Sequence, residues 1–258
     1  MNKINAVVLA GDSKKGVVQK DVDNKSLLPI CGKPMVEYVV DALRDTPLID
    51  KISITGPISL LREHLGDKVD FYIESRETLF DNVNAGMEPF ASDSAILLVT
   101  SDIPMITGEM VMDFIERCVK QGGDLCYPII EKQMNEEHFP GVERTYVKLK
   151  EGTYTGGNII YLNPAVVGPC EEFARKVIAY RKKPWKTGKL LGLKFLVRLL
   201  IGMLSIPKVE ARFSQLLDIE AAAIVSPYPE IGNDVDKPSD VEMVNRYFKK
   251  MHGDTPNI

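Results

Sequence analysis

Apolar and polar residues follow one another along the chain in short, regular patterns that predict strands and helices. Short apolar runs rich in β-branched residues, each ended by glycine, proline or a polar cluster, predict strands at 4–10, 51–54, 69–73, 95–100, 123–130 and 221–225. Apolar residues at 35, 36, 39, 40 and 43 have the spacing of a helix with one buried face. Further helices are predicted at 58–65 and from the Thr107 cap to about 121. Strand and helix in turn predict an α/β fold with a mostly parallel sheet.

Two stretches depart from this pattern. Residues 132–145 are polar without a clear period and are interpreted as a flap, followed by an edge strand at 146–149. Residues 173–209 hold ten lysines and arginines and no acid, within a chain of net charge −4. An apolar run at 190–204 inside that stretch is too short and too interrupted by charge to span a bilayer. We expect a helical insertion at about 173–217.

The basic, apolar segment 185–204, which begins at Trp185, leaves two interpretations open. Bulky apolar residues mixed with lysine and arginine suit a helix that lies on an anionic membrane surface. The alternative is a helix hairpin whose apolar face packs on the domain or on a second subunit, which would make the protein a homo-oligomer.

Composition sets the remaining bounds. A chain of 258 residues suits one large α/β domain or two small ones. Its net charge of −4 implies no overall attraction to nucleic acid. The first residues lack a charged stretch followed by a long apolar core, so no signal peptide is expected and a cytoplasmic location is predicted.

The first loop carries the most informative pattern. The apolar strand at 4–10 ends at Gly11, and a polar, lysine-bearing loop follows to residue 24. An apolar strand that leads into such a loop is how α/β proteins hold phosphate at the carboxyl ends of their strands. Neither G-x-G-x-x-G nor G-x-x-x-x-G-K-[ST] occurs, so a dinucleotide fold of the Rossmann type and a P-loop are not indicated.

Leu9-Ala10-Gly11, followed from Lys25 by K-x-L-L-P-I-x-G-K-P-M, resembles the first loop of the MobA-like and sugar-nucleotide pyrophosphorylase nucleotidyltransferases. Asp102-Ile103-Pro104, the Gly156-Gly157-Asn158 run and the stretch D-V-D-K-P-S-D at 234–240 match later elements of the same family. The resemblance implies one Rossmann-like, GT-A-like nucleotidyltransferase domain over 1–258.

The resemblance also implies a set of site residues. Lys25, Asp102 and Asp236 would be catalytic, with Asp102 and Asp236 holding Mg²⁺ and Asp234 as the next ligand. Gly157 and Asn158 would contact the acceptor. The nucleotide would be bound by a larger set: Leu9, Ala10, Gly11, Asp12, Lys14, Lys25, Asn82 and Ser101.

Several of these residues also have simpler explanations. A carboxylate at the end of a strand stopped by proline is well placed for a divalent ion, but Asp102 could also serve the turn. Asn82 follows Ser75 and Thr78, so this stretch either reads a base edge or caps a helix. Asn158 either faces a ligand beside the paired glycines or is a turn residue.

By resemblance, the protein would join an NTP to a phosphorylated sugar, polyol or lipid-linked acceptor and release pyrophosphate. Two alternatives remain. A glycosyltransferase of the same architecture would more often carry D-x-D, where this chain has Pro104. A non-catalytic regulatory protein is favoured by Asp12, where the family usually has a second glycine, and by the absence of arginine from the loop.

Overall fold

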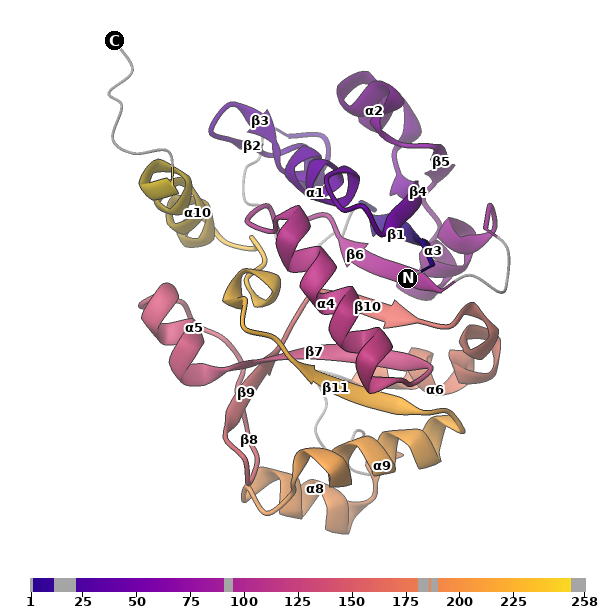
Figure 1. The fold of residues 1–258 in the computed structure, drawn as a ribbon, viewed down its shortest axis with the longest axis vertical. Coiled ribbons are helices and arrows are strands. Elements are labelled where there is room, and N and C mark those ends of the chain that lie inside the picture. Colours follow the sequence, from indigo (N-terminus) through magenta and orange to yellow (C-terminus); the bar gives the residue numbers. More distant parts are fainter. Residues whose placement is uncertain (1, 12–21, 91–94, 181–185, 187–189, 252–258) are drawn as a thin grey trace.

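The computed structural model describes residues 2–11, 22–90, 95–180, 186 and 190–251. They form a nine-stranded sheet with helices on both of its faces (Figure 1). In chain order the first elements are β1 (Ile4–Leu9), the 3₁₀ helix η1 (Lys25–Leu27), β2 (Pro29–Ile30), β3 (Lys33–Pro34), α1 (Met35–Arg44), β4 (Ile49–Gly56), α2 (Ile58–Leu65), η2 (Gly66–Lys68), β5 (Phe71–Glu74), α3 (Leu79–Met87) and β6 (Ile96–Thr100). They are followed by α4 (Gly108–Gln121), β7 (Leu125–Glu131), α5 (Lys132–His138), β8 (Val147–Lys148), β9 (Thr153–Gly156), β10 (Ile159–Leu162), η3 (Pro164–Val166), α6 (Val167–Tyr180), α8 (Leu193–Leu200), α9 (Ile206–Leu217), β11 (Ala221–Val225), η4 (Pro229–Gly232) and α10 (Pro238–Met251).

The strand order of the large sheet is β5-β4-β1-β6-β10-β7-β9-β8. β11 lies outside this order and pairs with β7 in parallel. β1 lies between β4 and β6 and runs parallel to both. β9 and β10 run against the strands beside them. The prediction of an α/β fold with a mostly parallel sheet is confirmed, and the carboxyl ends of β1 and β6 meet at one edge of the sheet.

The alternation of side chains along β1 builds two separate apolar layers. Ala6 and Val8 face the layer formed with α1, α2 and α4. Val7 faces the opposite layer, formed with α3 and the start of α6. A strand covered on both faces has no polar side, which is why residues 4–10 are apolar apart from Asn5.

The structure corrects the interpretation of 132–145 as an irregular flap, because residues 132–138 form α5. Asn135 on this helix is fully buried. Its side chain donates to the hydroxyl of Tyr146 and accepts a hydrogen bond from Asn233. A helix this short is stabilised by tertiary contacts rather than by its own periodicity, so the sequence pattern carried no signal for it.

The segment expected as a helical insertion holds most of α6 and all of α8 and α9, between β10 and β11. One face of α8 packs on the β8–β9 hairpin through Phe195 and Leu199, while α9 lies along β11 (Figure 1). Whether this segment is an insertion in the family fold stays a prediction. In the described part of the chain, no helix has both the length and the hydropathy needed to cross a bilayer.

Candidate functional site

The three residues predicted to be catalytic lie in one cluster. The ammonium of Lys25 donates to Asp102 Oδ2 at 2.6 Å and to Asp236 Oδ1 at 2.5 Å. Asp102 follows the end of β6, Asp236 precedes α10, and Lys25 opens η1. The Lys25 side chain is only 15% exposed, so this contact is not an ordinary surface ion pair. The fold therefore brings together three side chains that are far apart in the sequence.

Backbone hydrogen bonds fix the segments that carry these side chains. The Val235 N–H donates to the carbonyl of Asp102, which ties the last loop to the end of β6. The Ser101 N–H donates to the carbonyl of Leu9, and the Thr100 N–H donates to the carbonyl of Asn158. Because β1, β6, the Asn158 turn and the 234–236 segment are joined in this way, they hold their side chains at one edge of the sheet.

Asn24 is a positioning residue that the sequence analysis missed. Its Nδ2 donates to the carbonyl of Ala10 at 3.1 Å, and its Oδ1 accepts from the N–H and the hydroxyl of Ser26. The side chain is buried and caps η1, so it anchors Lys25 to the end of β1. The available signal was an asparagine directly before a short helical turn, which is a preferred N-cap.

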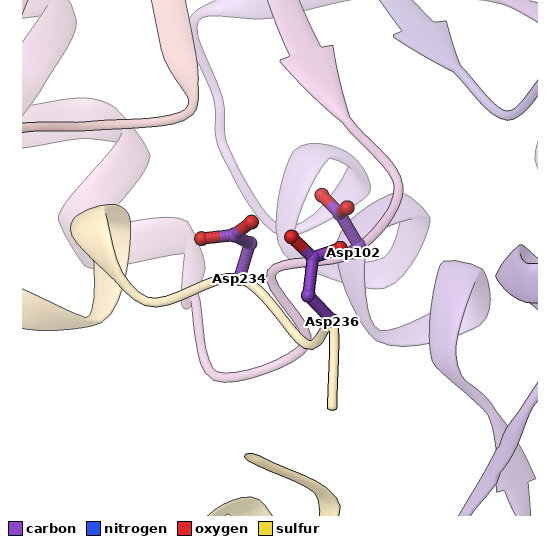
Figure 2. Close-up of side chains that lie close together, drawn as sticks. All are labelled: Asp102, Asp234 and Asp236. Atoms are coloured by element: carbon purple, nitrogen blue, oxygen red, sulfur yellow. The ribbon is translucent and has the colours of Figure 1, made fainter. Parts of the chain in front are cut away.

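Asp102, Asp234 and Asp236 point toward one another (Figure 2). One oxygen from each carboxylate lies within 4.8 Å of the others. Two cations balance part of this charge, since Lys25 binds Asp102 and Asp236 while Arg144 is ion-paired with Asp234. The cluster keeps one net negative charge.

The neighbours of these groups set their protonation. Burial acts to lower the pKa of Lys25, but Asp102 and Asp236 outweigh it and the pKa is raised, so the ammonium stays charged. Burial acts to raise the pKa of Asp236, but hydrogen bonding to Lys25 and the Lys25 charge bring it below its usual value. The pKa of Asp234 is raised, chiefly by burial, with the Asp102 charge adding to it against Arg144.

The donor set fits a divalent cation. Asp102 Oδ1 is buried and has no hydrogen-bond partner in the described part of the chain, although Oδ2 is held by Lys25. An unpaired buried carboxylate oxygen is costly, and a bound cation would satisfy it. Carboxylate oxygens are the ligands that Mg²⁺ prefers. Asp102 and Asp236 are the residues that would hold it, with Asp234 beside them.

Those residues predicted to bind nucleotide that the structure describes lie around the end of β1. A Cβ atom added at Gly11 would lie 3.7 Å from Ser75 Cβ and 3.8 Å from Asn82 Nδ2, so Gly11 faces the loop before α3. The Asn82 amide accepts from the Arg76 N–H and donates to the carbonyls of Arg76 and Thr78. Asn82 thus holds this loop in shape.

Thr78 caps α3 by accepting from the Asp81 N–H, so the capping interpretation of this stretch is confirmed. Contact between Asn82 and a base stays a prediction. Asp12, Lys14 and Trp185 lie outside the described residues.

Gly157 and Asn158, the predicted acceptor residues, occupy a crowded turn beside the cluster. A Cβ atom at Gly157 would lie 2.8 Å from Ile231 Cγ2 and 2.9 Å from Pro128 Cγ, so only glycine fits there. The backbone N–H and the side-chain amide of Asn158 both donate to the Ile231 carbonyl. The turn is therefore rigid, and its contact with an acceptor stays a prediction.

An α/β sheet that ends in a lysine-bearing loop and an aspartate cluster defines a protein of the nucleotidyltransferase class. Residues 6–183 match the MobA-like NTP transferase domain, and the chain belongs to that family. The family and the enzyme class predicted from the first loop are confirmed.

Relatives of known description match less than half of the chain. The bifunctional protein GlmU of Bacillus subtilis is 30% identical over 119 residues, which cover 45% of this chain and 26% of GlmU. GlmU of Listeria innocua is 35% identical over 109 residues, which cover 41% of this chain and 23% of that protein. The matched region thus spans about a quarter of the length of these relatives.

Solved structures extend the likeness to the whole fold. A hypothetical transferase from Thermus thermophilus superposes with a TM-score of 0.83 at 36% identity, over 93% of this chain and all of that one. A CMP:2-keto-3-deoxy-manno-octonic acid synthetase in complex with CTP superposes with a TM-score of 0.64 at 13% identity, over 97% of this chain and all of that one. At that identity the second likeness concerns the fold alone.

Proposed function

We propose that the protein is a Mg²⁺-dependent nucleotidyltransferase that joins an NTP to a phosphorylated small-molecule acceptor and releases pyrophosphate. The observation that carries the proposal is the contact of one largely buried lysine with two aspartates, one just after β6 and one just before α10. Nucleotidyl transfer needs positioning and charge neutralisation more than it needs a protein base, and this cluster offers both.

Each part of the site has a proposed role. Asp102 and Asp236 would hold Mg²⁺, which supplies charge neutralisation to phosphate oxygens when bound. Lys25, anchored by Asn24, would donate to the reacting phosphate, where its charge opposes the negative charge that grows in the transition state. Gly11 would leave room for a nucleotide beside the loop that Asn82 holds.

A pyrophosphate-release assay tests this function. We expect release with at least one of the four NTPs, with Mg²⁺ present, from a pool of sugar, polyol and lipid phosphates. A nucleotide titration by calorimetry accompanies the assay. No release across the pool, together with no nucleotide binding, would favour the regulatory alternative. Release of a nucleoside diphosphate from a nucleotide-sugar, in place of pyrophosphate from an NTP, would favour the glycosyltransferase.

We also propose that α8 contacts an anionic lipid surface on the cytoplasmic side of a membrane. Leu193, Val197 and Leu200 form an apolar stripe on its outer face and are 66%, 48% and 73% exposed. Lys194 and Arg198 flank this stripe and are exposed as well. The surrounding 173–209 stretch has ten basic residues and no acid, a charge that an anionic lipid surface complements.

A further inference from the structure

An apolar cavity of about 320 Å³ lies between the sheet and helices α3 and α6. Phe80 and Val83 of α3, Leu98 of β6 and Val167 of α6 line it. Among the described residues, no lysine, arginine, aspartate or glutamate lines the cavity. Its volume is about twice that of an engineered apolar cavity of about 150 Å³ that binds benzene, so it can hold a hydrocarbon group.

One end of the cavity lies at the edge of the sheet that carries the candidate site. Leu9, Thr100, Gly157 and Asn158 line this end, close to the segments that carry the aspartate cluster. Thr100 is the last residue of β6, two positions before Asp102. A molecule whose phosphate lies near Asp102 can therefore extend its remaining part into the cavity.

The wall of the cavity is held in place from outside. Arg175 of α6 pairs with Asp81 of α3 at 2.5 Å, and its guanidinium lies 5.0 Å from the centre of the Phe80 ring. Arg175 also donates to the Thr78 hydroxyl. These contacts join α6 to α3, so the space beneath them is a formed cavity.

The lining decides what kind of group can enter. A sugar or polyol hydroxyl in this space would lose its hydrogen bonds to water and find few partners, which is unfavourable. A hydrocarbon group has no hydrogen bonds to water to lose, and its burial is favourable.

We propose that the phosphorylated acceptor is amphiphilic, with its phosphate beside Lys25 and Asp102 and a hydrocarbon group in this cavity. The inference rests on the proposed function and names the substrate class for the same site.

Binding of n-alkyl monophosphates with two to eight carbons, measured by calorimetry on the full chain with Mg²⁺, tests the inference. Affinity should rise about fourfold for each methylene until the cavity is filled, since burial of a methylene contributes about 0.8 kcal/mol. Glucose 1-phosphate should bind more weakly than octyl phosphate. In the wild-type protein, nuclear Overhauser effects should connect the alkyl protons to the methyl groups of Leu98 and Val83.

A cavity-filling variant provides a second test of the proposal. Val83→Phe should remove the dependence of affinity on chain length, because the added ring takes the space of the longer alkyl groups. Val119→Phe makes the same change at an exposed position of α4, on the opposite face of the sheet, and should leave the whole series unchanged. The alkyl-proton contacts in the wild-type protein keep the test valid if Val83→Phe does not fold.

The failures of the two proposals are distinguishable. Affinity that does not depend on chain length, absent alkyl-to-Leu98 contacts or tighter binding of glucose 1-phosphate would each overturn the cavity assignment, even if pyrophosphate is released. Graded binding of the alkyl phosphates without any pyrophosphate release would support the cavity assignment and count against the proposed transfer reaction.

Discussion

Lys25 is the residue of the site that contacts two of its three aspartates. Its ammonium is largely withdrawn from water and is held by two carboxylates, and their charges raise its pKa despite the burial. A buried charge of this kind is tolerated only while its partners remain, and removal of either side of the contact leaves an unpaired charge.

Replacement of Lys25 with alanine should lower kcat by about 10²- to 10³-fold with a smaller rise in KM, because its charge matters most as the transition state forms. Steady-state kinetics with the identified NTP and acceptor measure both constants. Lys120→Ala, at an exposed position near the end of α4, is the control and should behave as the wild type. A change in KM alone would make Lys25 a binding residue only.

Asn24 should affect turnover through the placement of Lys25. Asn24→Ala removes the cap of η1 and the bond to the Ala10 carbonyl, so it should cost about 1 kcal/mol of folding free energy and lower kcat with little change in KM. Asn163 caps η3 by accepting from the Ala165 N–H. Asn163→Ala is thus a matched control, expected to lose similar stability in urea unfolding and no activity. Equal kinetic effects of the two variants would refute the positioning role.

Among the elements, α8 has one face that packs on the protein and one face that is exposed. Phe195 and Leu199 pack on the β8–β9 hairpin, while Leu193 and Leu200 on the outer face remain 66% and 73% exposed. The sequence analysis left packing and membrane contact as alternatives for this segment. The structure shows that packing accounts for one face only, which leaves the outer face for a lipid surface or a second copy of the chain.

Co-sedimentation with vesicles of anionic and neutral lipid distinguishes these partners. The chain should bind the anionic vesicles at low salt and release them as the Debye length falls. Lys194→Glu with Arg198→Glu should weaken binding by at least about thirtyfold, from two charges at about 1 kcal/mol each. Lys249→Glu with Lys250→Glu, an exposed pair at the end of α10, is the control. A stable dimer by light scattering, without vesicle binding, would assign the outer face to oligomerisation.

At the scale of the whole molecule, the candidate site exists only because distant segments meet. β1, β6, the Asn158 turn and the 234–236 segment are joined by backbone hydrogen bonds at one edge of the sheet. A ligand held between these segments binds the folded chain and not the unfolded one, so it must stabilise the entire domain.

Thermal unfolding with nucleotide should therefore report on the metal site. A nucleotide at about 100 times its Kd adds about 2.7 kcal/mol, which for a chain of this size corresponds to a rise in Tm of roughly 5–10 °C. We expect this rise with Mg²⁺ and its loss with EDTA or in Asp102→Asn and Asp236→Asn. Asp113→Asn, which removes a carboxylate paired with Arg117 on α4, should keep it. A rise of equal size without Mg²⁺, or in both cluster variants, would show that the metal assignment is wrong.

Local pattern determined much of this protein. Strand β11 was predicted at the residues where it occurs, and β1 to within one residue. A buried strand consists of a short run of apolar residues, and such a run can be recognised in the sequence. The Thr107 cap of α4 was predicted for the same reason, since a cap concerns only the next few residues. Lys25, Asp102 and Asp236 were selected through the family resemblance, since each belongs to a short motif that the family shares.

Tertiary structure decided the rest. The contact of Lys25 with Asp102 and Asp236 joins residues separated by 77 and 211 positions. Asn24, the helix α5 and the apolar cavity beside the site depend on buried partners from other parts of the chain. The sequence indicates which local conformation each residue favours, given the residues next to it along the chain. Burial, charge pairing and the shape of a cavity depend on which surfaces meet after folding, so only the folded chain determines them.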